Sequence, residues 1–173
     1  DPERTDLLIN GNISNYDSLS VVVRLNNFEI RKIETLFGEY LSDVNGKVSL
    51  SIDLNGSVTD PEINGSVLFD SIKINVNYLG VEIMAHDLLK FDQDQFKFEN
   101  FKVFDANRTL AYINGRIEHV LFSDFKFDSL RLNPKGDFVI LNTTDDDNSL
   151  YYGKGVIREK MKNLETLAGI IVD

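Results

Sequence analysis

Two histidines and one run of aspartates are the residues whose chemistry could support a metal or catalytic site. His86 and His119 each lack a second histidine or a carboxylate at a metal-ligand spacing. Asp145-Asp146-Asp147 lacks the glycine and the glutamate that an EF-hand calcium loop needs, and fits a solvated hairpin tip better. We therefore expect no metal site, and we interpret both histidines as strand-end or surface residues.

Other catalytic signatures are absent from the sequence as well. There is no Gly-x-Ser-x-Gly elbow and no phosphate-binding glycine loop. The chain has no cysteine, which excludes a disulfide scaffold and a thiolate metal site. Pairs of carboxylates cannot be identified without knowing what lies across the sheet. We predict that the chain is not an enzyme, that it has no catalytic residues and that it uses no cofactor.

Charge and composition narrow the class of partner. The formal net charge of −10 makes nucleic acid an improbable partner, because phosphate binding needs clustered lysine and arginine. An anionic membrane surface is disfavoured for the same reason. Hydrophobic residues make up 42% of the chain, which is enough for a large core. We expect residues 1–173 to form a single segment of a longer protein, since the sequence opens at Asp1-Pro2 without methionine.

The dominant pattern is an alternation with a period of two, which predicts strands with one apolar face and one polar face. It is clearest in Val48-Ser49-Leu50-Ser51-Ile52-Asp53-Leu54 and continues to Val58, before Thr59-Asp60-Pro61 interrupts it. We predict a strand over 63–69, a separate strand from Ile72 onward, and about a dozen strands in all. Helical spacing in Ile30, Ile33, Phe37, Tyr40 and Leu41 predicts one short amphipathic helix over about residues 30–42.

Asn-Gly pairs recur along the chain in the unit Asn-Gly-x-(Ile/Val), present in five copies: 10–13, 45–48, 55–58, 64–67 and 114–117. Such a pair usually signals a two-residue hairpin turn. In most copies, however, the glycine occupies a position where the alternation expects an inward apolar side chain. Glycine inside a strand marks a bend or a close approach. We predict that Gly11, Gly56, Gly65 and Gly115 lie on the inner face and widen a groove there.

A dozen one-faced strands need a cover for their apolar face, and one short helix is too small to supply it. The sheet could fold onto itself around a closed core, or curve into a trough whose apolar lining binds lipid acyl chains. If it is a trough, the predicted lining is Val48, Leu50, Ile52, Leu54, Val58, Ile63, Val67, Phe69, Ile72, Ile74, Val76, Ile83, Phe96, Phe98, Ile113, Ile117, Phe125, Phe127, Leu130, Leu132, Phe138 and Ile140.

Three segments resemble TamB-type proteins, the translocation and assembly module family within the AsmA-like lipid-transfer superfamily. The run from Ile52 to Val67 resembles the family unit in which two Gly-x-(Leu/Val) strands flank an Asp-Pro turn. The segments 111–119 and 138–144 are similar to later strands of that region, in the same order. Further counterparts are the helical piece before residues 40–46 and the segments 78–81 and 148–153, so the resemblance extends along nearly the whole chain. It implies an all-β, curved, elongated sheet, the β-taco, with an apolar concave face.

The resemblance also implies a function and a location. Family members are anchored in the inner membrane by an N-terminal helix, which would lie outside this segment, and they span the periplasm. They partner with an outer-membrane barrel of the Omp85 class, and they are linked to outer-membrane protein assembly and to phospholipid movement between the membranes. We accordingly expect a periplasmic, non-enzymatic segment whose groove contacts phospholipid acyl chains.

Two other functions remain open at this point. The sheet edge could pair with strands of nascent outer-membrane proteins by β-augmentation, as a chaperone would. Alternatively, the segment could be a structural β spacer with a filled core. An excised half-pipe could also cover its apolar edges by edge-to-edge dimerisation.

Overall fold

The computed structural model describes residues 4–14, 18–36, 38, 40–120, 123–126, 130–144, 152–158 and 170–172. Strands and one 3-10 helix make up the described structure. In chain order they are β1 (Asp6–Ser14), β2 (Ser18–Glu29), η1 (Ile30–Leu36), β3 (Leu41–Ser57), β4 (Pro61–Val76), β5 (Val81–Asp92), β6 (Gln95–Asp105), β7 (Leu110–Val120), β8 (Ser123–Lys126), β9 (Arg131–Pro134), β10 (Phe138–Thr143), β11 (Gly153–Ile157) and β12 (Ile170–Val172).

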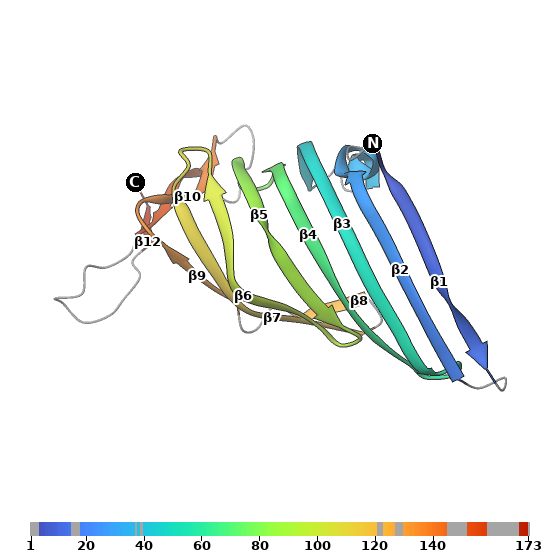
Figure 1. The fold of residues 1–173 in the computed structure, drawn as a ribbon. Helices are drawn as coiled ribbons and strands as arrows, with labels where there is room; N and C mark the ends of the chain where they lie inside the picture. The colour runs from blue at the N-terminus through green and yellow to red at the C-terminus, as the bar shows by residue number, and fades with distance from the viewer. Residues whose placement is uncertain are drawn as a thin grey trace.

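The first nine strands form one antiparallel sheet. Strands β1 to β8 follow each other in sequence order, and β9 also pairs with β7. The sheet is curved and open, with β1 at one edge, and it does not close into a barrel (Figure 1). The predicted all-β fold with a curved, elongated sheet is confirmed.

The pairing registers place apolar residues on one face of this sheet. Cross-strand partners share a face, and one register row runs through Ile9, Val23, Ile52, Gly65, Phe91, Phe96 and Ile117. The adjacent row on the opposite face runs through Leu8, Arg24, Ser51, Ser66, Lys90, Lys97 and Arg116. The alternation read from the sequence thus becomes two faces of opposite character.

A line of β-bulges crosses the sheet. Register shifts fall between Leu25 and Phe28 in β2, between Phe69 and Ile72 in β4, and between Phe98 and Phe101 in β6, with related shifts in β3 and β5. Each bulge inserts extra residues and bends its strand. We call this line the crease. Apolar residues continue on the same face beyond the crease, because the extra residue in each bulge keeps the alternating side chains in phase with that face.

Side chains from neighbouring strands satisfy backbone groups along the crease. Asn27, Ser71 and Asn100 have positive φ values of 53°, 55° and 53°. Their N–H groups donate to Ser49 Oγ at 3.1 Å, to His86 Nδ1 at 3.3 Å and to Asn114 Oδ1 at 2.9 Å, respectively. The crease is therefore a hydrogen-bonded feature of the sheet, consistent with the rule that backbone donors find partners.

Two expectations about elements need correction. The strands predicted on either side of Asp70-Ser71 are one strand, β4, which continues through the bulge. The helix predicted over about 30–42 is a 3-10 helix that ends at Leu36, and Leu41 already pairs with Val76. Pairing with β4 competes with helix continuation here, and the Asn77 N–H also donates to Tyr40 O at 3.0 Å.

Strands β10 to β12 form a second, three-stranded sheet that lies at the C-terminal end of the main sheet (Figure 1). The buried core lies between the two sheets. Its fully buried members are Leu89, Phe101, Val103, Ala111 and Phe138, of which only Phe138 comes from the second sheet. This cluster lies at the β5–β7 end of the apolar face, while Val44 of β3, Ile72 of β4 and Phe91 of β5 are buried outside it.

Candidate functional site

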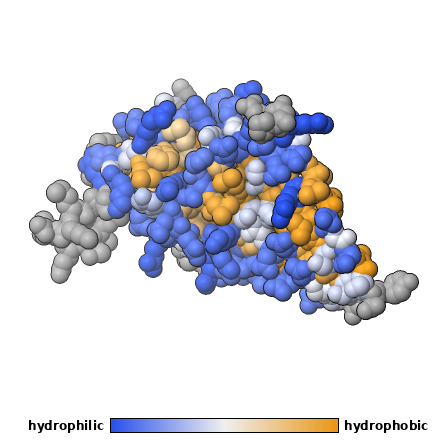
Figure 2. All heavy atoms as spheres, in the orientation of Figure 1, coloured by the Kyte–Doolittle hydropathy of each residue, from blue (hydrophilic) through white to orange (hydrophobic). Residues whose placement is uncertain are grey.

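The candidate site is the apolar face of the main sheet, which is open at one end. Every residue of β1 is exposed, and its inward residues Leu7, Ile9 and Ile13 are 62%, 62% and 63% exposed. Exposed hydrophobic side chains gather over the N-terminal strands at the right of Figure 2. The inward apolar residues of β2, β3 and β4 on the side of the crease that holds the β3–β4 turn are half-buried. Nothing among the described residues covers this part of the face.

The other end of the face is packed with aromatic side chains. Phe101 contacts Phe69 and Phe98 edge to face, with ring centroids 5.6 Å and 5.5 Å apart. Such T-shaped pairs stabilise a core beyond the area that they bury. Leu89, Phe101, Val103 and Ala111 are buried there. The face over β5, β6 and β7 thus contains a buried cluster, with Phe96, Phe98 and Ile113 half-buried around it.

Phe138 is the residue that covers this end of the face. It extends from β10 and is 2% exposed, packed against residues of β5, β6 and β7. Ile140 of the same strand packs against the cluster while remaining partly exposed. Both were predicted as lining residues of one sheet. They instead belong to the second sheet and cover the face, because the chain leaves the main sheet after β9.

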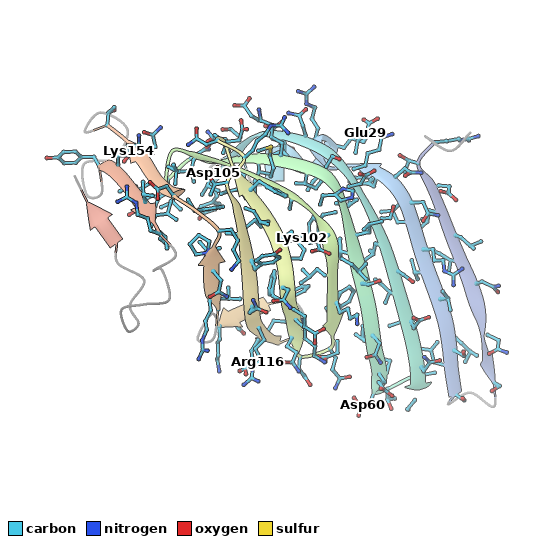
Figure 3. All side chains as sticks on the ribbon, turned by 60° about the vertical axis from the view of Figure 1, so that its left-hand side comes forward. Glu29, Asp60, Lys102, Asp105, Arg116 and Lys154 are labelled. Carbon is cyan, nitrogen blue, oxygen red and sulfur yellow. The ribbon has the colours of Figure 1, made fainter. Side chains whose placement is uncertain are left out.

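Asp105 holds β10, which carries Phe138, against the main sheet. This carboxylate is 1% exposed and lies at the end of β6, beside the second sheet (Figure 3). Its Oδ1 accepts a hydrogen bond from the Thr109 N–H at 2.8 Å, and its Oδ2 accepts one from the Val139 N–H at 3.0 Å. Further along β10, the Asn142 N–H donates to Leu79 O at 2.9 Å. Both oxygens of this buried carboxylate are thereby satisfied, and its role is structural.

Most predicted lining residues lie on the apolar face of the main sheet: Val48, Leu50, Ile52, Leu54, Ile63, Val67, Phe69, Ile72, Ile74, Val76, Ile83, Phe96, Phe98, Ile113, Ile117 and Leu132. Val58 does not, because β3 ends at Ser57 and Val58 lies in the following turn, 44% exposed. Leu130 precedes β9 and is 37% exposed. Phe127 and the side chain of Phe125 lie outside the described residues, as does Asp145-Asp146-Asp147.

The predicted lining left out the inward residues of the first two strands, although Ile9 and Ile13 were expected to alternate with Gly11 on the inner face. Leu7, Ile9 and Ile13 in β1, and Val21, Val23 and Leu25 in β2, lie on the apolar face beside β3. The signal was present, since these residues alternate with Leu8, Asn10, Val22 and Arg24. Apolar residues on both faces, such as Leu8 and Val22, weaken the contrast on which the pattern depends.

The glycines lie within strands, as predicted, and two of them lie close to atoms of a neighbouring strand. All five Asn-Gly pairs lie inside β1, β3, β4 or β7. A Cβ atom on Gly65 would collide with the ring of Phe91, its partner on β5. One on Gly11 would meet the backbone of Ser20 and Val21 in β2. Gly65 therefore makes room for an aromatic ring, and Gly11 allows a close approach of strands.

The other two predicted glycines are needed for their backbone conformation. Gly56 and Gly115 have φ values of 99° and 126°, which side-chain-bearing residues rarely adopt. Gly56 is the penultimate residue of β3, and Gly115 lies opposite Phe98 in β6 next to the crease. Positive φ at both positions is consistent with the predicted bending, and the widening of a groove by these glycines stays a prediction.

Charged residues lie at the strand ends and on the outer face. Glu29 ends β2 and Asp60 lies in the β3–β4 turn, at opposite ends of the long strands (Figure 3). The apolar rows over β1 to β4 contain no ionisable residue between these ends. A ligand with an apolar body and a polar end would match this distribution.

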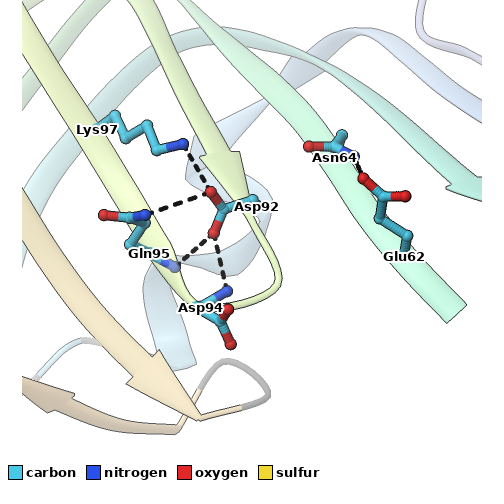
Figure 4. Close-up of polar contacts among 6 residues, drawn as sticks. All are labelled: Glu62, Asn64, Asp92, Asp94, Gln95 and Lys97. Carbon is cyan, nitrogen blue, oxygen red and sulfur yellow. Dashed lines mark hydrogen bonds and ion pairs between the residues drawn. The ribbon is translucent and has the colours of Figure 1, made fainter. Parts of the chain in front are cut away.

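The β5–β6 hairpin carries the one carboxylate with a resolved pKa shift among the described residues. Asp92 Oδ1 accepts hydrogen bonds from the N–H groups of Asp94 and Gln95, both at 3.0 Å, and Oδ2 lies 2.7 Å from Lys97 Nζ (Figure 4). Burial alone raises the pKa of Asp92. The hydrogen bonds and the Lys97 charge outweigh burial, so the pKa lies below its ordinary value of 3.8. This contact stabilises the turn at the end of the sheet.

Neither histidine lies in a cluster of potential metal ligands among the described residues. His119 is buried near the end of β7, and its ring lies 4.9 Å from that of Phe96. The hollow beside it, about 250 Å³, is lined by Asp94, Gln95, Arg116, Glu118, Asp124 and Lys126. His86 is largely exposed at the crease. Among the described residues, no group of three or more potential ligands is placed to hold a metal ion.

No helix in the described part of the chain has the length and apolarity needed to cross a bilayer. Comparisons of the chain with protein-family models, with curated proteins and with solved structures give no match.

Proposed function

We propose that this chain is a non-enzymatic lipid-binding segment whose open apolar face, over β1 to β4, holds phospholipid acyl chains. The observation that carries this proposal is the exposure of a continuous apolar face at the N-terminal end of the sheet. Burial of each CH₂ group contributes about 0.8 kcal/mol, so a chain of ~16 carbons could gain on the order of 10 kcal/mol. Polar headgroups would stay in water beside the charged strand ends.

The resemblance to TamB-type proteins supports a biological setting for this binding. In that setting the segment belongs to a longer periplasmic protein that is anchored in the inner membrane outside residues 1–173. It would conduct phospholipids between the inner and outer membranes and act with an Omp85-class barrel in outer-membrane protein assembly. The negative charge of the chain agrees with a partner other than nucleic acid.

A matched pair of substitutions in β1 tests acyl binding. Ile9 lies on the apolar face and Leu8 on the opposite face, and both are at least half exposed. A charge at either position should therefore leave the fold intact. We expect Ile9→Glu to weaken binding of a fluorescent phospholipid by about tenfold, because a carboxylate beside the acyl chain must be desolvated. Leu8→Glu should bind like the unchanged protein, and equal loss in both variants would refute the proposal.

One observation favours strand pairing as a second function. Strand β1 is the edge of the main sheet and is exposed along its whole length, so its outer backbone groups could pair with a client strand or with a second copy of the chain. Pairing of this kind uses backbone groups, and Ile9→Glu would then leave client binding unchanged while lipid binding is lost.

A further inference from the structure

We propose that Phe138, with the three-stranded sheet that carries it, ends the acyl site. An acyl chain then lies over β1 to β4 and stops where β10 covers β5 to β7. This inference rests on the proposed function, and it adds the residue that sets the length of the site.

The apolar face itself does not stop at β4. The row through Ile9, Val23 and Ile52 continues without a break to Phe91, Phe96 and Ile117. Exposure falls along the same direction, from 62% at Ile9 to 5% at Phe91. The face stays apolar along this row, and Phe91 is buried where its ring lies over Gly65 and beside Phe96. Nearer the Asp105 end of the same strands, Leu89, Phe101, Val103 and Ala111 are buried in one cluster with Phe138 of β10.

The cover is a separate layer and not an extension of the main sheet. Strands β10 to β12 pair only with one another among the described strands. Contact with the main sheet is made by the inserted ring of Phe138, by the Val139 N–H on Asp105 and by the Asn142 N–H on Leu79 O. Removal of the cover would break these contacts without unpairing any strand of the main sheet.

The side chains of β10 supply the same chemistry as a ligand. Phe138 and Ile140 bury apolar carbon against the main sheet, as an acyl chain would. Ligand and cover therefore compete for the face over β5 to β7. Loss of the Phe138 ring should let the acyl chain extend toward Phe101 and Ile113.

The experiment maps the reach of a bound lipid on the full chain. A phosphatidylethanolamine with a diazirine at the end of one acyl chain is bound, irradiated, and its adducts are located by peptide mass spectrometry. In the unchanged protein we expect adducts on inward residues of β1 to β4 and at least fivefold fewer on β5 to β7. Phe138→Ala should raise adducts on β5 to β7 to a level similar to that on β1 to β4.

Controls separate this inference from the proposed function. Leu68→Ala removes an exposed leucine from the outer face and should leave the adduct pattern unchanged. Should Phe138→Ala fail to fold, Asp105→Asn keeps the side-chain shape but replaces one of the two acceptors and should also admit lipid to β5 to β7. Adducts over β1 to β7 in the unchanged protein, or over β1 to β4 alone in every folded variant, would refute the proposal that Phe138 ends the acyl site. Absence of adducts on all inward residues would overturn the acyl site itself.

Discussion

Asp92 shows how single polar residues hold the ends of this sheet. The carboxylate receives two backbone N–H groups of its own turn and the ammonium of Lys97 across the β5–β6 pair. These contacts favour the charged form, so Asp92 stabilises the fold only while it is ionised. Asp105 also accepts backbone N–H groups with both of its oxygens, from Thr109 and from Val139.

Asp92→Asn should lower the free energy of unfolding at neutral pH by about 1 kcal/mol, because the amide loses the Lys97 ion pair and one strong acceptor. The pKa of Asp92 is lowered in the fold, so its contribution is complete above the ordinary value of 3.8 and disappears as the pH falls through the folded-state pKa below it. Urea titrations at neutral pH and near pH 3 measure this. The exposed neighbour Asp94 provides the control, and a difference between Asp92→Asn and the unchanged protein that grows on acidification would contradict the assignment.

Among the elements, the crease determines where the strands of the main sheet bend. Bulges in successive strands fall beside one another, so they bend the sheet along one line instead of at scattered points. The side chains of Ser49, His86 and Asn114 satisfy the bulged N–H groups across strand boundaries. The curvature of the apolar face therefore depends on polar residues that lie outside that face.

Asn114→Ala tests the contribution of the crease. The substitution leaves the Asn100 N–H without its side-chain acceptor, and we expect a loss of about 1 kcal/mol in unfolding free energy and faster hydrogen exchange at Asn100 and its neighbours. Asn133→Ala, an exposed asparagine on the adjacent β9, is the matched control. Comparable destabilisation by both variants would show that the crease hydrogen bond contributes nothing specific.

Sequence periodicity predicted the strands and the two faces, because a period of two is a direct consequence of the pleat. It divided β4 at Asp70-Ser71, since a bulge and a strand break leave the same trace in the pattern. Similarly, the helical spacing from Ile30 was real, but pairing of Leu41 with Val76 ended the helix early. Local pattern could not reveal pairing between distant segments.

The site, too, was predictable only where the pattern within a single strand contained the necessary information. The lining of β3 and β4 was predictable because it alternates with polar residues, whereas the covering role of Phe138 was not. Phe138 and Ile140 alternate like the lining residues, and only the departure of β10 from the main sheet changes their role. Gly65 was expected to leave space, but Phe91 fills that space from the neighbouring strand. No single-strand pattern contains that information.

In the whole molecule, the closed-core interpretation describes one end of the apolar face, and the open-trough interpretation describes the other. The face over β5 to β7 contains the buried cluster around Phe101 and Phe138, whereas the inward residues of β1 are exposed and those of β2 to β4 on the Asp60 side of the crease are half-buried. A spacer would be expected to bury its apolar face along its whole length, whereas this chain leaves one end exposed. The exposed end is the reason to propose a ligand.

The most direct test is native mass spectrometry of the detergent-free protein purified from bacteria, followed by lipid extraction. We expect folded chains to carry co-purified phospholipid, about one molecule per open face, and we expect the lipid to be lost in Ile9→Glu and kept in Leu8→Glu. A folded chain free of lipid, whether monomeric or associated through β1, would refute acyl binding and favour the spacer or strand-pairing function.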